Sequence, residues 1–527
     1  MKTRRTKNIW LSLGLILCIA YFLWFNHPFP LEDGSLSKEE AALAALQYFD
    51  LDPEEAKVSV IYDVDQEAIA YLQKEQLLDS YLDRYDPVYP LEYYLVEIEM
   101  PEDNRYSAHV HLYEGIITAW SRPVPSDIAE SSEAAALAAA EAYFHQQRPA
   151  DLAATETSSL QLPDGSFQIY YEYDHDRIGE AKRTVTVHTA GGAVIAYQSG
   201  FMPPSSFLAW LEQQNARAEQ FTGLTLWASA ALAAAALTIA ILYRRSIHWS
   251  DGLLLVSITV IIQTIQYMNT LPNYVSLIEL RQAGWLLYAF EFIFAASFTA
   301  VFCLTVYLPY LGGKALLARE GRSRLLHLRD WNRELRNAVL RGYGFGFLIL
   351  AVQTVIFQVG SAAFHVWWIP DPSLSTENML WPLLMPLTAW AAAISEEIIY
   401  RLFAVTLFKK LFRSTFIAVL LSSMLWGLGH TAYPVYPVYT RFIEVTIIGI
   451  LFGYLFIRLG FAAAVFAHAV ADSVLMGLDI AGLGIGGLIA ACVYIALPAV
   501  IGWLLARRPP MSQRSSPAYA PLDLPPR

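Results

Sequence analysis

The feature that most limits the possible fold is a series of ten apolar segments, each about as long as a membrane-spanning helix needs to be. One follows the basic residues near the start of the chain, and nine lie beyond Thr222. Their approximate ranges are 9–25, 222–243, 252–270, 285–310, 342–366, 381–408, 414–433, 440–457, 461–478 and 484–505. With 55% hydrophobic and 16% charged residues, the chain is also too apolar for a soluble protein of 527 residues. The sequence therefore predicts a polytopic α-helical membrane protein with about ten transmembrane helices.

Charge divides the chain into two parts. Residues 28–220 contain 34 acidic and 11 basic side chains, a net charge of −23, whereas the remainder contains 14 acidic and 25 basic side chains, a net charge of +11. These two values account for the overall net charge of −12. An acidic domain joined to a basic membrane body argues against nucleic acid as a partner.

The basic clusters predict the orientation in the membrane. Residues 1–27 combine a basic flank with an apolar segment and no Ala-x-Ala cleavage site, so we expect an uncleaved signal anchor rather than a removed signal peptide. Cytoplasmic loops are rich in Lys and Arg. Ten crossings of the cell membrane, with both termini cytoplasmic and residues 28–220 extracellular, place every basic cluster on the cytoplasmic side. These clusters are Arg244–Arg245, residues 314–341, Lys409–Lys410, Arg458 and Arg507–Arg508.

The predicted extracytoplasmic domain contains two similar halves. The segment 37–49 recurs as 132–144, and in each a serine is placed to cap an alanine-rich helix. Strand-like runs and matching hairpin ends follow in each half. We therefore expect a duplicated α+β domain with repeats at about 36–125 and 131–203. The layout resembles the PepSY-type modules found outside many bacterial membrane proteins, although alanine-rich helices can also resemble one another through composition alone.

The remaining organisation follows from the apolar segments. We expect accessory transmembrane helices at 222–310, a basic cytoplasmic loop at 312–340, a membrane core at 341–506 and a disordered tail at 507–527. The basic loop mixes Arg and Lys with pairs of Leu, which suits either a helix lying on the anionic inner leaflet or an ordinary charged loop.

Three apolar segments of the core carry ionisable side chains at similar depth. Placing a charge inside the hydrocarbon layer costs free energy, so ionisable residues there usually have a function. Measured by helix rise from the nearest cytoplasmic end, the depths are ~20 Å for Glu396, ~24 Å for His430, ~15 Å for His468 and ~21 Å for Asp472. We therefore expect these groups to face one another or a water-filled cavity within the membrane.

The spacing within this cluster predicts distinct roles. Glu397 and Arg401 are four residues apart on a helix and can pair, while Glu396 points about 100° away and is free to meet water as a general base. His430 can share that water or pass a proton to the leaving amine. His468 and Asp472, again four apart, can polarise a scissile carbonyl. The pattern is that of an enzyme that works within the bilayer.

Three motifs over about residues 340–505 resemble those of the CPBP intramembrane protease family, which includes CAAX proteases, bacteriocin-processing enzymes and Abi proteins. The motifs are Glu396-Glu397-Ile-Ile-Tyr-Arg401, Trp426-Gly-Leu-Gly-His430 and His468-Ala-Val-Ala-Asp472. Two positions depart from the family pattern. Trp426 stands where Phe is usual, with an expected packing role, and Asp472 stands where the eukaryotic-type enzymes have Asn.

The resemblance implies a role for each motif residue. Glu396 would activate the hydrolytic water, Glu397 and Arg401 would hold the site in register, and His430 would assist proton transfer. The oxyanion would be bound by His468 with Asp472. A zinc or iron site made of Glu396, His430, His468 and Asp472 is an alternative. We favour a mechanism without metal or other cofactor, because the chain has no His-Glu-x-x-His motif.

The sequence leaves three functional classes open. The favoured one is an intramembrane endopeptidase, similar to CAAX prenyl protease 2, acting on a peptide or membrane-protein substrate in the lipid bilayer. The second is a non-catalytic scaffold or sensor whose exported domain binds a ligand. A proton-coupled transporter is disfavoured, because corresponding broken helices are absent from the two halves of the sequence. Among substrates, secreted peptide precursors and membrane-protein tails are favoured over prenylated proteins.

Overall fold

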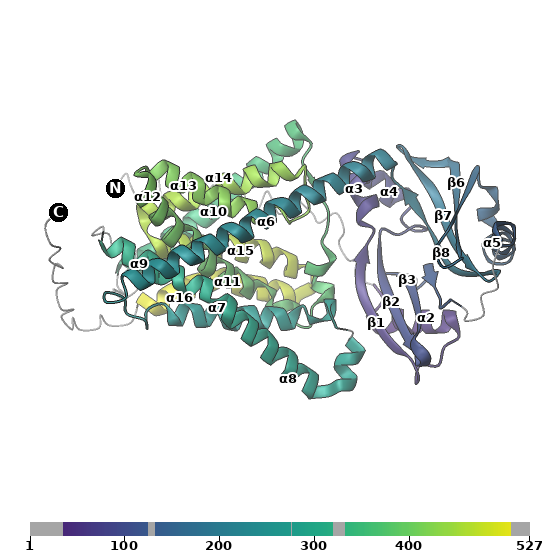
Figure 1. Ribbon diagram of the computed structural model, residues 1–527, viewed down its shortest axis with the longest axis horizontal. Coiled ribbons are helices and arrows are strands. Elements are labelled where there is room, and N and C mark those ends of the chain that lie inside the picture. The colour runs from purple at the N-terminus through teal and green to yellow at the C-terminus, as the bar shows by residue number, and fades with distance from the viewer. Residues whose placement is uncertain (1–34, 125–131, 276, 320–332, 507–527) are drawn as a thin grey trace.

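The computed structural model describes residues 35–124, 132–275, 277–319 and 333–506. It consists of a sheet domain at one end and a helical bundle at the other (Figure 1). The predicted signal anchor at 9–25 and the predicted disordered tail at 507–527 lie outside the described residues.

The sheet domain contains one antiparallel sheet of eight strands in the order β1-β2-β3-β4-β8-β7-β6-β5. The two halves meet where β4 pairs with β8 and Trp120 lies opposite Tyr197. The strands of both predicted repeats thus form one continuous sheet, while their origin by duplication stays a prediction. The strands are β1 (Lys57–Val64), β2 (Glu92–Met100), β3 (Asn104–His111), β4 (Ile117–Ser121), β5 (Glu156–Gln161), β6 (Phe167–Ile178), β7 (Ala181–Ala190) and β8 (Ala193–Met202).

Helices in this domain begin where the sequence signals predict. Ser37 forms a capping box with Glu40 at the start of α2 (Lys38–Phe49), and Ser132 caps α5 (Glu133–Gln147). Each helix buries small alanine side chains, which bring its backbone close to its neighbours. Two shorter helices, α3 (Gln66–Lys74) and α4 (Leu78–Arg84), lie between β1 and β2 in the chain.

The helical bundle makes the chain a multi-pass membrane protein. Among the described residues, six helices are long and apolar enough to cross a membrane, and two shorter apolar helices accompany them. The predicted total of ten crossings is not confirmed, since the segment at 381–408 is divided into shorter elements. The helices are α6 (Ser205–Leu242), α7 (Leu253–Asn269), α8 (Leu277–Phe302), α9 (Leu304–Arg319), α10 (Arg333–Phe364), α11 (Thr388–Glu396), the π-helix η8 (Glu397–Val405), α12 (Thr406–Phe412), α13 (Thr415–Leu428), α14 (Val438–Leu459), α15 (Phe461–Ala481) and α16 (Gly484–Ala506).

Helix α9 continues to Arg319, into the segment 312–340 that is predicted as a basic cytoplasmic loop. Gly312 and Gly313 let this helix pack tightly against η8. A Cβ at Gly313 would lie 2.8 Å from the side chain and carbonyl oxygen of Leu402, so glycine permits a contact that a larger residue would prevent. Residues 320–332 lie outside the described part, and α10 begins at Arg333.

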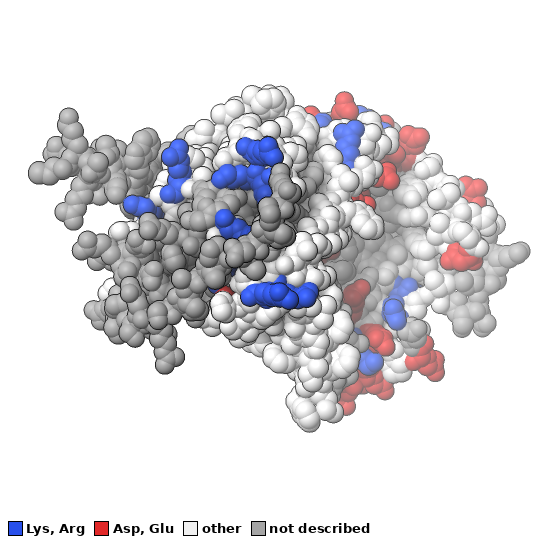
Figure 2. Space-filling view, turned by 60° about the vertical axis from the view of Figure 1, so that its left-hand side comes forward, with Lys and Arg blue, Asp and Glu red and all other residues white. Residues whose placement is uncertain are grey.

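Charge is arranged along the long axis of the molecule. Lys and Arg side chains gather on the end of the bundle remote from the sheet domain, whereas Asp and Glu side chains predominate on the sheet domain (Figure 2). Arg244, Arg245, Arg413 and Arg458 lie at the helix ends of this remote side. The distribution is the one expected of a protein with this end in the cytoplasm, but the orientation itself stays a prediction.

One continuous helix joins the two parts. The 38 residues of α6 run from the last strand of the sheet into the bundle, over roughly 57 Å (Figure 1). Beside its first turns lie β9 (Trp367–Trp368) and β10 (Val435–Tyr436), which pair with each other. Trp210 of α6 contacts the rings of Trp367 and Tyr436, with centroid distances of 6.2 and 6.4 Å.

A buried asparagine fixes the sheet domain to the segment that precedes α11. The amide oxygen of Asn378 accepts a hydrogen bond from the backbone N–H of Tyr62 in β1 at 2.9 Å, and its amide nitrogen donates to the Tyr62 carbonyl at 2.8 Å. The same nitrogen donates to the Pro372 carbonyl at 3.0 Å. The Asn378 side chain thus pairs with edge strand β1 as a neighbouring strand would.

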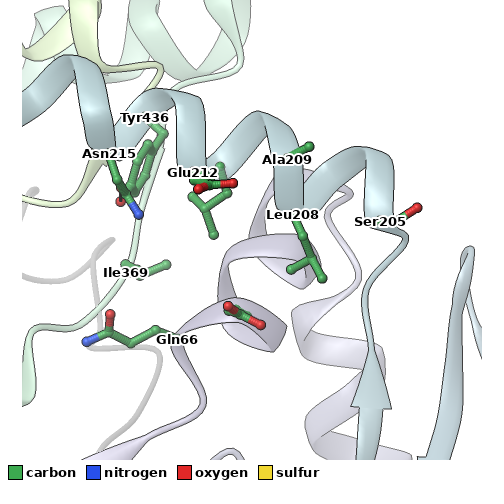
Figure 3. Close-up of a pocket in the computed structure, with 10 residues that line it drawn as sticks. Gln66, Ser205, Leu208, Ala209, Glu212, Asn215, Ile369 and Tyr436 are labelled. Carbon is green, nitrogen blue, oxygen red and sulfur yellow. Dashed lines mark hydrogen bonds between the residues drawn. The ribbon is translucent and has the colours of Figure 1, made fainter. Parts of the chain in front are cut away.

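A cavity of ≈ 560 Å³ lies at the same junction (Figure 3). Its walls come from the start of α3, the first turns of α6, and the segments that contain Ile369 and Tyr436. The cavity therefore lies where the sheet domain, the helix that enters the bundle and the two loops next to the bundle meet.

Candidate functional site

The predicted site residues come from three neighbouring parts of the bundle. Glu396 ends α11, Glu397 and Arg401 lie in η8, and His468 and Asp472 lie one turn apart on α15. Helix α15 is buried along most of its length and rich in alanine, so its backbone can approach η8 closely. The π-helix has a wider turn than an α-helix, and such turns occur frequently at functional sites.

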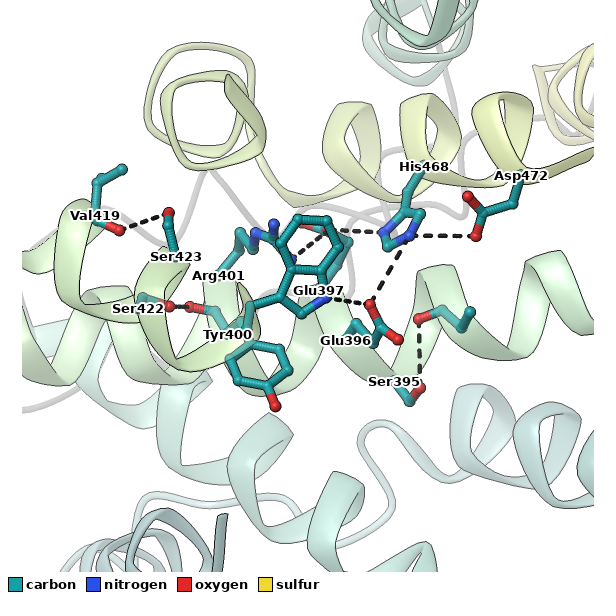
Figure 4. A network of polar contacts seen from close by, with 12 residues as sticks. Ser395, Glu396, Glu397, Tyr400, Arg401, Val419, Ser422, Ser423, His468 and Asp472 are labelled. Carbon is teal, nitrogen blue, oxygen red and sulfur yellow. Dashed lines mark hydrogen bonds and ion pairs between the residues drawn. The ribbon is translucent and has the colours of Figure 1, made fainter. Parts of the chain in front are cut away.

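The centre of the cluster is the carboxylate of Glu397, which is fully buried. Its Oε1 lies 3.0 Å from Nη1 of Arg401 and 2.9 Å from Nδ1 of His468 (Figure 4). The guanidinium of Arg401, 1% exposed, lies over the rings of Trp426 and Phe452, with Cζ 4.2 and 5.0 Å from the centroids. The structure thus confirms the predicted pairing of Glu397 with Arg401 and extends it to His468.

The imidazole of His468 faces carboxylates on both sides. Nδ1 contacts Glu397, whereas Nε2 lies 3.3 Å from Oδ2 of Asp472 and 3.9 Å from Oε2 of Glu396 (Figure 4). Phe452 stacks on the ring with a centroid distance of 4.7 Å. A carboxylate only accepts hydrogen bonds, so this geometry suits a doubly protonated imidazolium that donates on both sides.

Glu396 differs from Glu397 in its access to solvent. The Glu396 side chain is 24% exposed and that of Asp472 23%, whereas the Glu397 side chain is 0% exposed. The indole N–H of Trp426 donates a hydrogen bond to Oε2 of Glu396. Glu396 is therefore held in place by a neighbour while one part of it remains open to water or to a ligand.

His430 lies beside this cluster, without a hydrogen bond to Glu396 or His468 in the part of the chain that the structure describes. The Trp426 ring, whose N–H donates to Glu396, contacts the rings of both His430 and His468, with centroid distances of 4.8 and 5.8 Å. The charges of Glu396 and His468 also act on the His430 imidazole. Within the described residues, its contacts are with Trp426, whose carbonyl lies 2.9 Å from Nδ1, and with the ring of Tyr433, which stacks on it at 5.9 Å. The expectation that His430 shares one cavity with Glu396 and His468 stays a prediction, although the helix-rise estimate behind it does not hold. Helix α13 ends at Leu428, so His430 lies in the following turn, where that measure no longer applies.

The alternative zinc or iron set is not assembled. Among the residues that the structure describes, no three His, Cys, Asp or Glu side chains are placed so that they could hold a metal ion. Nδ1 of His468 is engaged by Glu397, and Nδ1 of His430 lies at a backbone carbonyl. Nδ1 contacts of this kind also occur at histidines that bind a metal through Nε2, so they do not decide between the two mechanisms, and the mechanism without metal stays a prediction.

Two functional features were missed by the sequence reasoning. Trp426 was expected to pack, yet it also donates a hydrogen bond to Glu396. The sequence did contain a signal for this hydrogen bond, because a buried indole N–H normally requires an acceptor and Glu396 is predicted at a similar depth in the membrane. Phe452 of α14, which covers both Arg401 and His468, carried no such signal among many apolar residues.

Comparisons with known proteins point to the same region. Residues 378–474 match the family model of type II CAAX prenyl endopeptidase Rce1-like proteins. The chain is also similar to the sporulation-killing factor biosynthesis protein SkfC of Bacillus subtilis (strain 168), with 27% identity over 143 residues. That alignment covers 26% of this chain and 28% of SkfC, so the chain spans about a quarter of that relative's length. No solved structure matches the chain.

Proposed function

We propose that this protein, whose C-terminal part carries an Rce1-like CAAX protease domain at residues 378–474, is an intramembrane endopeptidase that uses a glutamate-activated water. The observation that carries the proposal is the contrast between two adjacent carboxylates. Glu397 is buried and neutralised by Arg401 and His468, whereas Glu396 is partly open and 3.9 Å from Nε2 of His468. One carboxylate holds the site together, and the other is free to act as a base.

In the first step, a water molecule hydrogen-bonded to Glu396 attacks the carbonyl carbon of the scissile peptide bond. Glu396 takes one proton from the water as the new C–O bond forms, and the carbonyl π electrons move to the oxygen. The indole of Trp426 orients Glu396 for this transfer, since it fixes Oε2. Phe452 and the surrounding apolar side chains limit bulk water at the site.

The developing oxyanion is stabilised by Nε2–H of His468. In the structure this nitrogen is 3.3 Å from Asp472, whose side chain is 23% exposed, so the N–H lies on the open side of the cluster, where an oxyanion can share it with Asp472. Glu397 and Arg401 maintain the imidazolium, because the buried carboxylate accepts from Nδ1. Fixed donors of this kind act strongly where water is excluded.

In the second step, the tetrahedral intermediate collapses, the C–N bond breaks and the amine leaves with the proton first taken by Glu396. We assign His430 an assisting role in this transfer. Its Nδ1 donates to the Trp426 carbonyl, which leaves Nε2 as the acceptor of a neutral imidazole.

The proposal includes the orientation of the chain. The acidic sheet domain lies outside the cytoplasmic membrane, both termini lie inside, and peptides or membrane-protein tails reach the site from the outer side. The concentration of basic side chains on the remote end of the bundle supports this orientation. Single cysteines introduced at exposed positions of the sheet domain should react with an impermeant maleimide added to intact cells.

The proteolytic activity is tested by comparing membranes that contain the wild-type protein with membranes that contain the Glu396→Gln variant at equal abundance. We expect new peptide termini in the wild-type sample alone, found by terminal-peptide proteomics. Identical sets of termini would favour the alternative, a non-catalytic membrane scaffold or sensor.

A further inference from the structure

The cavity at the junction of the two parts has the lining of a peptide-binding site. Apolar side chains of Leu208, Ile369 and Tyr436 form part of its wall, and the carboxylates of Glu67 and Glu212 supply negative charge from two different helices. Leu208 and Glu212 project from α6 over the space that the cavity occupies (Figure 3). A volume of ≈ 560 Å³ is within the range of pockets that take a small molecule or one to two side chains.

The two carboxylates are available to a ligand. Glu67 and Glu212 are both exposed, and neither has an ion-pair partner among the described residues. They also belong to the part of the chain with a net charge of −23 over residues 28–220. The field of such a domain attracts cationic groups and repels anionic ones. The complementary ligand is therefore a peptide that combines a basic side chain with apolar neighbours.

Helix α6 leads from the cavity to the turn that carries His430. Asn215, which lines the cavity, accepts a hydrogen bond from the Tyr436 hydroxyl at 2.6 Å. Further along the same helix, Thr225 lies against Gly429, next to His430. Ten residues of helix separate Asn215 from Thr225, a rise of ~15 Å, so an extended peptide needs at least about five residues to reach from the cavity to the turn that carries His430.

We propose that this cavity is a docking site for the substrate, in which Glu67 and Glu212 bind an Arg or Lys side chain located at least about five residues from the scissile bond. The inference rests on the proposed peptidase activity for its biological role, but binding at the cavity can be measured without turnover. It names the substrate class as a cationic, partly apolar peptide and gives the sheet domain a role in substrate selection.

The test uses the full-length Glu396→Gln protein in nanodiscs of neutral phosphatidylcholine, so that the lipid does not attract the cationic peptide electrostatically, and empty nanodiscs measure the remaining binding to lipid. The probe is a fluorescein-labelled dodecapeptide in which Arg alternates with Leu, and affinity is read by fluorescence anisotropy. The double substitution Glu67→Gln and Glu212→Gln should weaken binding roughly three- to tenfold, as expected for two solvent-accessible charge pairs. The difference should disappear at high salt, since such pairs are screened.

A matched control separates this site from the general field of the domain. Glu114→Gln with Glu141→Gln removes the same charge from exposed positions that do not line the cavity, and should change the affinity less than twofold. A peptide with citrulline in place of Arg should bind the wild type and the Glu67/Glu212 variant equally. Equal losses in the two double variants, or no loss in either, would overturn the docking site.

The outcome is separable from that of the proposed function. If peptides bind as predicted but wild-type membranes yield no new termini, the docking site is supported and the proposed peptidase activity is wrong. If proteolysis is found while the Glu67/Glu212 variant binds the Arg-Leu probe as the wild type does, the peptidase stands and the docking site is wrong. With a cleavable peptide, moving the Arg by three residues should lower kcat/KM in the wild-type background only.

Discussion

Nδ1 of His468 lies 2.9 Å from Oε1 of Glu397, and both side chains are almost completely enclosed by the bundle. This contact joins residues that are 71 positions apart in the chain and lie on different helices, and Arg401 pairs with the same carboxylate oxygen. It makes Glu397 a structural residue with an indirect effect on chemistry. In the proposed mechanism the reacting groups are Glu396 and His468, whose Oε2 and Nε2 atoms are 3.9 Å apart.

We expect Glu396→Gln to reduce turnover of a cleaved substrate by ~10² or more, because the amide keeps the size of the side chain but cannot accept the proton of the water. The Glu396 side chain is 24% exposed, so its replacement should leave the protein folded. Initial rates at saturating substrate and the thermal transition of the purified protein measure the two effects. A variant with full activity would contradict the role of Glu396 as base.

The neighbouring carboxylate should respond differently. Glu397→Gln and Arg401→Ala each leave an uncompensated charge in a buried site, which typically costs about 3–5 kcal/mol. We therefore expect lower yields and an earlier thermal transition for both variants, together with lost activity. Glu396→Gln serves as the matched control, since it removes a carboxylate one residue away. Equal stability of all three variants would show that the Glu397–Arg401 pair does not hold the helices together.

Local signals predicted much of this molecule. The serine caps at Ser37 and Ser132 predicted the starts of two helices, because capping depends on residues next to each other in the chain. Apolar segments of suitable length predicted most of the bundle. Because a charge in hydrocarbon is costly, Glu396, His468 and Asp472 could be selected from the sequence as candidate site residues. In the structure, Nε2 of His468 lies 3.3 Å from Oδ2 of Asp472.

The structural features that the sequence did not predict depend on packing between distant segments. The π-helix at Glu397–Val405 has no separate sequence signature, since its wider turn is adopted against α9, α13 and α15. The pairing of β4 with β8 joins segments that are far apart in the chain, and the repeats alone do not specify it. The hydrogen bonds of Asn378 could not be predicted for the same reason. Asn378 is a polar residue in a loop, and its partner Tyr62 lies 316 residues earlier in the chain.

The sheet domain should show a pH dependence that originates at Glu92. Burial raises the pKa of this carboxyl to about 7 from an ordinary value of 4.5, although the Tyr62 hydroxyl donates to it at 2.7 Å. The folded state then binds more protons than the unfolded state between pH 4.5 and 7. The stability attributed to this group is therefore present below pH 4.5 and is lost as the pH rises to 7.

Replacing Glu92 by Gln removes this titration. We expect Glu92→Gln to raise the thermal transition of the sheet domain at pH 8 and to change it little at pH 4.5, as measured by scanning fluorimetry of the full-length protein. Glu97→Gln, in the same strand but exposed, is the matched control and should have a small effect at both values. An equal shift at both pH values would assign the gain to packing rather than to proton binding.

Asn378 should control how firmly the sheet domain is held against the entrance to α11. Its side chain makes three hydrogen bonds with the backbone of Tyr62 and Pro372, and it is 1% exposed. In Asn378→Ala these backbone groups lose their partners, at a cost of about 1–3 kcal/mol for each buried group left unsatisfied. We expect faster hydrogen exchange at Tyr62 and in residues 372–381, measured by mass spectrometry in nanodiscs.

The loosened segment leads into the helix that ends at Glu396, so kcat should fall while the thermal transition of the bundle stays nearly constant. Asn273→Ala is the matched control, because this partly exposed side chain makes one hydrogen bond to the same segment, at the Ser373 carbonyl. Unchanged exchange in Asn378→Ala would mean that the aromatic contacts of Trp210 with Trp367 and Tyr436 suffice to hold the two parts together.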